Sequence, residues 1–141
     1  MSLKLFDVDR RAHDVVLAFR DRRDRKGNDV LGESHTMRMT TVYGLERFWG
    51  EHLRLRRENP DKADFWQETW KTLYDIMKKD AGIEIPNDPV NPNDTEAVKA
   101  MADKLWDFDQ EQRKVTLSIL IELCDSLVWW TQRYKKPKSG R

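Results

Sequence analysis

The stretch VTLSILIELCDSLVWWTQRY, residues 115–134, decides the fold of this 141-residue chain. Apolar residues recur in it at alternating steps of three and four, the spacing of one face of an α-helix. This row consists of Leu120, Leu123, Leu127, Trp130 and Tyr134. A second apolar row beside it consists of Leu117, Ile121, Cys124 and Val128. A helix that is apolar over most of its circumference packs against several other helices. The stretch therefore predicts a compact all-α bundle built around a buried C-terminal helix.

The rest of the sequence predicts four more helices, about five in all, and contains no alternating pattern of the kind that strands show. Their expected ranges are 7–23, 34–57, 60–80 and 94–107. Gly44 in the second range costs roughly 1 kcal/mol relative to alanine, so we expect a helix break or a close helix crossing there. Asn59 followed by Pro60 is typical of a helix start. Trp106 is expected to face the core.

Two segments predict irregular structure. Residues 20–34 alternate arginine with aspartate and offer few apolar anchors, so we expect a mobile loop. Residues 83–93 contain three prolines and predict a linker without helix. We expect one domain over residues 1–134, followed by a basic, disordered tail over residues 135–141.

The net charge of +1 conceals a strong asymmetry along the chain. Residues 1–57 carry 13 basic and 9 acidic residues, residues 58–112 carry 6 and 14, and residues 113–141 carry 7 and 2. One cysteine excludes an internal disulfide and is consistent with a reducing compartment. Neither a signal peptide nor a membrane-spanning run is recognisable. These features predict a soluble, cytoplasmic protein without membrane contact.

The sequence gives no catalytic signature, and we expect neither a metal nor another cofactor. The three histidines lack the i, i+4 spacing of a helical metal site. Glu122 and Asp125 have the spacing of half a helical magnesium site. The second half would have to come from three carboxylates of the 60–80 segment, Asp64, Glu68 and Asp75. Two interpretations stay open for Glu122 and Asp125: pairing with a neighbouring cation, or a carboxylate-dependent nucleotide hydrolase.

Basic residues gather in three places along the chain, each next to aromatic residues. The clusters are Arg20, Arg22 and Arg23, extended by Arg25 and Lys26; then Arg54, Arg56 and Arg57; then Arg133, Lys135 and Lys136. Cations beside flat apolar surfaces suit single-stranded nucleic acid, whose phosphates need positive charge and whose bases need stacking partners. The alternative is that these residues complement helix dipoles at helix C-termini.

Two tryptophans are candidates for contact with protein partners. Tryptophan is favoured at interfaces, and the chain contains six. Trp49 lies near the second basic cluster. Trp129 falls on the polar strip of the last helix, one turn after Asp125, so we expect the first helix, a partner subunit or a nucleobase to cover it.

The order of these features resembles the small all-helical subunit of type III CRISPR effector complexes. Three elements carry the resemblance: RRAHDVVLAF (10–19), YGLERFW (43–49) and WWTQRY (129–134). The match covers about half the chain. It lacks the proline that the family has before its Gly-Leu element, and the 83–93 linker has no counterpart. The resemblance implies a non-catalytic subunit of antiviral defence that packs along guide RNA and target strand beside larger subunits.

Together these observations predict a non-enzymatic accessory subunit of a ribonucleoprotein complex. Its partners would be the backbone of RNA or single-stranded DNA and larger protein subunits. A helical protein–protein adaptor of bacterial or phage origin, without nucleic acid, is one alternative. The nucleotide hydrolase is the other.

Overall fold

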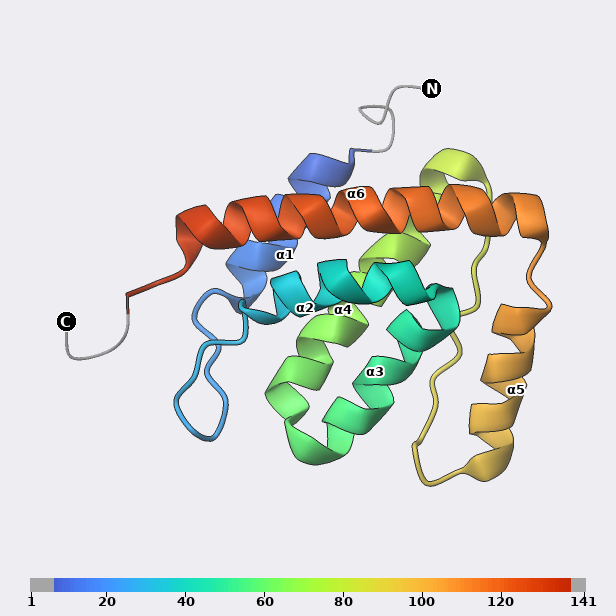
Figure 1. Ribbon diagram of the computed structural model, residues 1–141, viewed down its shortest axis with the longest axis horizontal. Helices are drawn as coiled ribbons and strands as arrows, with labels where there is room; N and C mark the ends of the chain where they lie inside the picture. Colours follow the sequence, from blue (N-terminus) through green and yellow to red (C-terminus); the bar gives the residue numbers. More distant parts are fainter. Residues whose placement is uncertain (1–6, 138–141) are drawn as a thin grey trace.

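A computed structural model describes residues 7–137, which fold into six α-helices and contain no strand (Figure 1). The prediction of an all-α bundle is therefore confirmed. The elements are α1 (Val8–Phe19), α2 (Glu33–Thr40), the 3-10 turn η2 (Thr41–Tyr43), α3 (Leu45–Glu58), α4 (Pro60–Ile76), the π-helical turn η3 (Met77–Ala81), α5 (Thr95–Trp106) and α6 (Gln110–Tyr134). The expected second helix is two helices, because Gly44 between them has φ 95°, a left-handed value that suits glycine.

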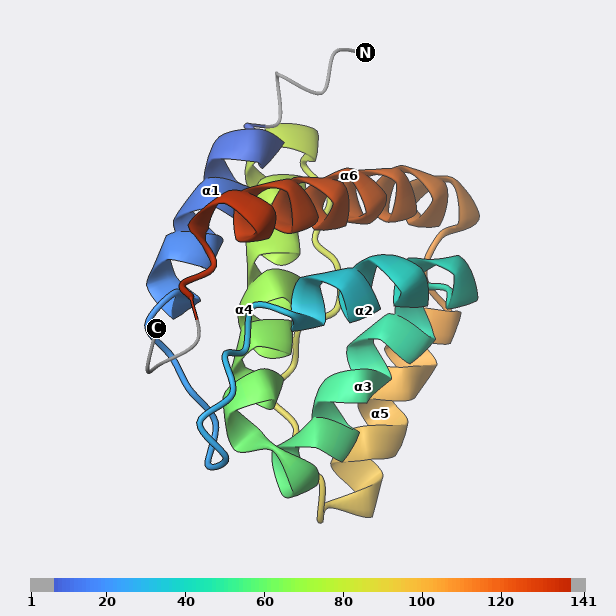
Figure 2. The ribbon, with the colours of Figure 1, turned by 60° about the vertical axis from the view of Figure 1, so that its left-hand side comes forward.

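Helix α4 lies in the middle of the bundle, with α3 folded back against it as a hairpin (Figures 1 and 2). Eight of its 17 residues are buried. Helix α6 crosses over α1, α2 and α4, and its Leu120, Leu123 and Leu127 are fully buried. The opposite side of α6, which includes Asp125 and Trp129, is exposed. Helix α6 is thus covered along one side rather than all around.

The segment between α1 and α2 is more firmly anchored than its composition suggests. Val30 and Leu31 are fully buried. The carboxylate of Asp24 accepts hydrogen bonds from the backbone N–H groups of Lys26 and Asn28, each at 2.9 Å. The expectation of few apolar anchors in this segment was wrong, because two adjacent aliphatic residues at its end insert into the core. Helix α1 also ends at Phe19, so the arginines that follow project from a loop.

Helix ends follow the capping residues in the sequence. Asn59 caps α4 by accepting from the backbone N–H of Lys62, with Pro60 at the first helical position. Asp109 caps α6 by accepting from the backbone N–H of Gln112 at 3.0 Å. These side chains satisfy N–H groups that a helix start leaves without intrahelical partners.

The linker between η3 and α5 runs beside α4 (Figure 1). Ile85 is buried, and Trp70 of α4 donates its indole N–H to the carbonyl of Pro86 at 3.0 Å. After α6, residues 135–137 have no regular secondary structure. The rest of the predicted disordered tail, residues 138–141, lies outside the described residues. Within residues 7–137 we find no helix with both the length and the apolar character that crossing a bilayer requires.

Candidate nucleic-acid interface

The three basic clusters, far apart in the sequence, lie along one edge of the molecule. The ends of α1 and α6, the loop after α1 and the α3–α4 junction are neighbours there (Figures 1 and 2). We call residues 20–29, 51–64 and 132–137 the basic edge. It carries twelve basic and seven acidic residues.

Helices α1 and α6 are joined at their C-terminal ends. Arg20 donates from Nε to the carbonyl of Tyr134 at 2.7 Å. Lys136 forms an ion pair with Asp21, and its hydrogen bond and charge lower the pKa of that carboxyl. The Tyr134 hydroxyl lies 2.9 Å from Nε2 of His13 on α1. The first and third basic clusters are therefore held side by side.

Asp64 of α4 joins the first cluster to the second. It forms an ion pair with Arg22 and another, at 2.8 Å, with Arg56 of α3. Arg22 also donates to Asp61 at 2.8 Å, and hydrogen bonding to Asp61 and Asp64 raises the pKa of its guanidinium. One carboxylate thus holds two arginines from different segments close together.

The loop after α1 is attached to the start of α4 through Asp24. Its carboxylate accepts a hydrogen bond from Nδ2 of Asn59 at 3.0 Å. This bond, together with those from the backbone of Asn28 and Lys26, lowers the pKa of Asp24. The loop is thereby folded into a tight turn that carries Arg25 and Lys26 at its exposed tip.

The cations of the basic edge fall into two groups. Five cations form ion pairs within the chain: Arg22, Arg54, Arg56 and Lys136 of the predicted site, and Lys62. Seven others make no ion pair with any described residue: Arg20, Arg23, Arg25, Lys26, Arg57, Arg133 and Lys135. An arginine that is already paired must give up its carboxylate partner before it can bind a phosphate. The unpaired group therefore offers the most accessible positive charge.

The two tryptophans predicted to contact partners have different environments. The side chain of Trp129 remains 47% exposed, and α1 does not cover it. The guanidinium of Arg133 stacks on its ring, 3.7 Å from the centroid. Trp49 is only 6% exposed, and its ring meets that of His52 in a T-shaped contact. Trp49 is therefore a core residue, because α3 turns it toward α4, and it does not provide an exposed anchor.

A cavity of about 530 Å³ opens beside the basic edge, between α1, α3, α4 and the linker. We call it the aromatic cleft. Its apolar lining includes Phe19, Trp49 and Trp70, and its polar lining includes His52, Gln67 and Asn87. Arg22 and Asp64 line it as well and belong to the basic edge.

Sequence reasoning missed His52, Gln67 and Asn87. The repeat of polar residues at Asp64, Gln67 and Lys71 marks one face of α4 and could have indicated this wall.

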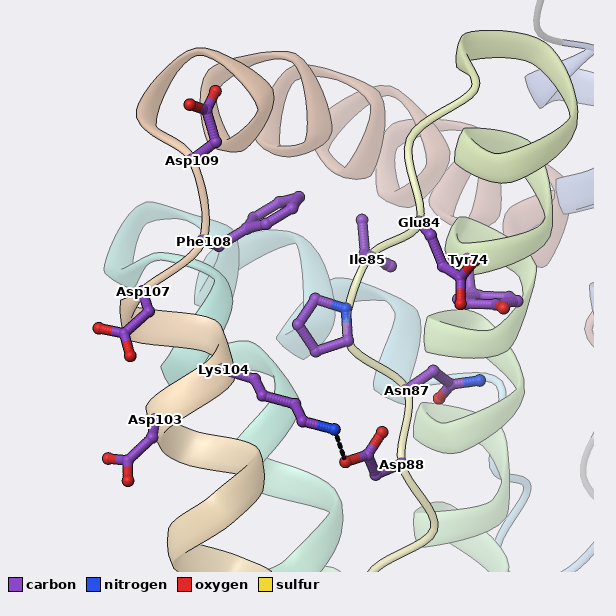
Figure 3. A pocket seen from close by; sticks show the side chains of 11 residues that line it. Tyr74, Glu84, Ile85, Asn87, Asp88, Asp103, Lys104, Asp107, Phe108 and Asp109 are labelled. Carbon is purple, nitrogen blue, oxygen red and sulfur yellow. Dashed lines mark hydrogen bonds and ion pairs between the residues drawn. The ribbon is translucent and has the colours of Figure 1, made fainter.

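A larger hollow of about 640 Å³ lies on the other side of the linker, against α5 (Figure 3). Its lining carries five carboxylates: Glu84, Asp88, Asp103, Asp107 and Asp109. Lys104 is its only cation, and it pairs with Asp88 at 2.5 Å. Residues 84–111 as a whole carry eight acidic and two basic residues. This end of the molecule repels phosphate.

The carboxylates considered for a magnesium site are largely occupied by cations of the chain. Asp125 pairs with Arg38 of α2 at 2.5 Å, as the pairing interpretation predicted for it, whereas Glu122 makes no ion pair with any described residue. Asp75 pairs with Lys71 at 3.1 Å, and Asp64 pairs with two arginines. Among residues 7–137, no group of three histidine, cysteine or carboxylate side chains has a metal-binding arrangement.

Comparison of the chain with protein-family models, with curated proteins and with solved structures found no match in any of the three.

Proposed function

We propose that this protein is a non-catalytic accessory subunit of a cytoplasmic ribonucleoprotein complex of the RNA-guided CRISPR type. Its basic edge binds the backbone of RNA or single-stranded DNA. One observation carries the proposal: three basic segments, separated by up to about a hundred residues of sequence, lie along a single edge. Positive charge on one edge and negative charge around α5 restrict a phosphate backbone to one side of the molecule.

A single strand suits this edge better than a duplex because Trp129 is exposed at one end of it. Bases of a single strand stack on aromatic side chains, and arginine adds a cation–π contribution. Arg133 already lies over the Trp129 ring and leaves nearly half of the side chain in solvent. This pair offers one flat surface next to the unpaired cations of residues 133–135.

Contacts with larger subunits would use apolar side chains elsewhere on the surface. The most exposed large apolar residues are Met39, Val42, Tyr43 and Trp106, all more than 60% exposed. Three of them lie close together in the sequence: Met39 near the end of α2, and Val42 and Tyr43 in η2. Exposed apolar groups of this kind mark contact sites. They also support the second candidate, a protein–protein adaptor without nucleic acid.

Binding of a fluorescent single-stranded RNA, followed by anisotropy over a series of salt concentrations, tests the proposal. Each phosphate contact contributes about 0.7 to the slope of log affinity against log salt concentration. The variant Arg23→Gln, Arg57→Gln, Lys135→Gln loses three unpaired cations of the basic edge and should lower the slope by about 2.

The matched control is Lys99→Gln, Lys104→Gln, Lys114→Gln, which removes the same charge outside the basic edge. It should leave the slope nearly unchanged. Equal losses in the two variants would mean that net charge, and not this edge, attracts the strand. Absence of binding to RNA and to single-stranded DNA at low salt would reject the proposal and favour the adaptor.

A further inference from the structure

We propose that the aromatic cleft receives one unstacked nucleobase of the strand whose backbone follows the basic edge, an inference that rests on the function proposed above. The cleft and the edge are physically continuous. Arg22 and Asp64 line the cleft and also belong to the ion-pair network of the edge. A strand bound to the edge therefore passes the mouth of the cleft.

The lining has the composition of a site for a flat, partly polar molecule. Phe19, Trp49 and Trp70 supply the apolar wall, while His52, Gln67 and Asn87 supply hydrogen-bonding groups. Small-molecule sites combine an apolar, aromatic lining with polar groups that fix orientation, and in this cleft polar and charged side chains outnumber the apolar ones. The volume of about 530 Å³ falls within the usual range of such sites.

The polar groups of the cleft have defined roles. His52 is buried, which lowers the pKa of its imidazole, so the ring is neutral near pH 7. Its Nδ1 lies 2.6 Å from the carbonyl of Trp49 and must donate to it, which leaves Nε2 as an acceptor. The side-chain oxygen of Gln67 accepts from Arg56, so the amide nitrogen remains as a donor. Bases present both donors and acceptors on their edges.

Charge distinguishes a base from a phosphate as the occupant. Two cations of the lining, Arg22 and Lys71, face three carboxylates, Asp64, Glu68 and Asp88. A phosphate would meet net negative charge there, whereas a base is neutral at pH 7. The unpaired cations lie outside the cleft, where the sugar-phosphate backbone would run. This division places charge recognition on the edge and base recognition in the cleft.

The test compares two fluorescent strands of equal length and charge in the anisotropy assay: an RNA oligomer and its counterpart in which every base is absent. The wild-type protein should bind the oligomer with bases about five- to a hundredfold more tightly, the range that base contacts contribute. Equal affinity for both strands would overturn the base site while leaving the proposed function intact. Absence of binding to either strand would reject both.

Two variants locate the base preference. Asn87→Leu removes a polar group of the cleft without changing charge and should bind the abasic strand as the wild type does. Its preference for bases should fall at least about threefold, as the loss of hydrogen bonds implies. The control, Gln112→Leu, replaces an exposed residue of α6 and should change the affinity for neither strand. If Trp129→Ala abolishes the preference and the cleft variant retains it, the base stacks on Trp129 and the cleft proposal is wrong.

Discussion

Replacing Asp64 by asparagine should lower the stability of the protein and strengthen its binding to nucleic acid. The carboxylate of Asp64 pairs with Arg22 and Arg56, and all three side chains are between 32% and 40% exposed. Pairs this exposed are screened by solvent and contribute between zero and about 1 kcal/mol each. Arg22 retains Asp61 as a partner. We therefore expect Asp64→Asn to lower the free energy of unfolding by about 1 kcal/mol.

The same ion pairs oppose phosphate binding, because a phosphate must displace the carboxylate. Removing a competing interaction of about 1 kcal/mol should tighten RNA binding about fivefold. The salt dependence should also steepen, by about 0.7 for each arginine that gains a phosphate. Urea denaturation measures the first effect, and anisotropy titration with single-stranded RNA measures the second.

The matched control is Asp75→Asn, which removes a carboxylate that pairs with Lys71 outside the basic edge. Asp75→Asn changes the net charge by the same amount as Asp64→Asn but should raise the affinity for RNA much less. If Asp64→Asn binds RNA no more tightly than the wild type, Arg22 and Arg56 do not contact phosphate. These two arginines would then belong to a structural ion-pair network, and only the unpaired cations of the basic edge would be left to bind the backbone.

Three further predictions concern other parts of the molecule. Leu123→Ala in the fully buried row of α6 should lower the unfolding free energy by about 2–5 kcal/mol in urea denaturation; a loss under about 1 kcal/mol would contradict the position of the core. Trp129→Ala should cost the isolated protein no more than about 2 kcal/mol, because the half-exposed side chain loses its Arg133 stacking and its T-shaped contact with Trp130; a larger fall in the same denaturation assay would make Trp129 a core residue. The pKa of Asp24 lies below its usual value, chiefly through the Asn59 hydrogen bond, so its stabilising contribution is present above about pH 3.8 and is lost as pH falls through the folded-state pKa. Denaturation curves at pH 7 and pH 3 should therefore differ less in Asp24→Asn than in the wild type, and equal differences would show that Asp24 is not responsible.

Helical periodicity was enough to predict the bundle, because apolar residues at steps of three and four have to share one face. It also identified Leu120, Leu123 and Leu127 as core residues. It was wrong about Trp106, which is 67% exposed: it directly follows the buried Leu105 and so lies about 100° around the helix from it. Trp106 is the last residue of α5. The chain turns away there, so no neighbouring helix covers the side chain.

The arrangement of charges could not be predicted from local patterns. The first basic cluster is interrupted by two aspartates. In the fold, Asp21 pairs with Lys136 and Asp24 accepts from Asn59, which leaves Arg23 and Arg25 without an ion-pair partner among the described residues. Such pairings join segments more than thirty residues apart. They depend on tertiary packing, so only the presence of basic clusters, and not their convergence on one edge, was predictable.

The linker segment at Asn87 and Asp88 lines the acidic hollow on one side and the aromatic cleft on the other. It is a shared wall, fixed to α4 through Trp70 and to α5 through Lys104. Any ligand that shifts this wall alters the shape of the opposite cavity. By linkage, occupancy of one cavity then changes the affinity of the other by the same factor in both directions.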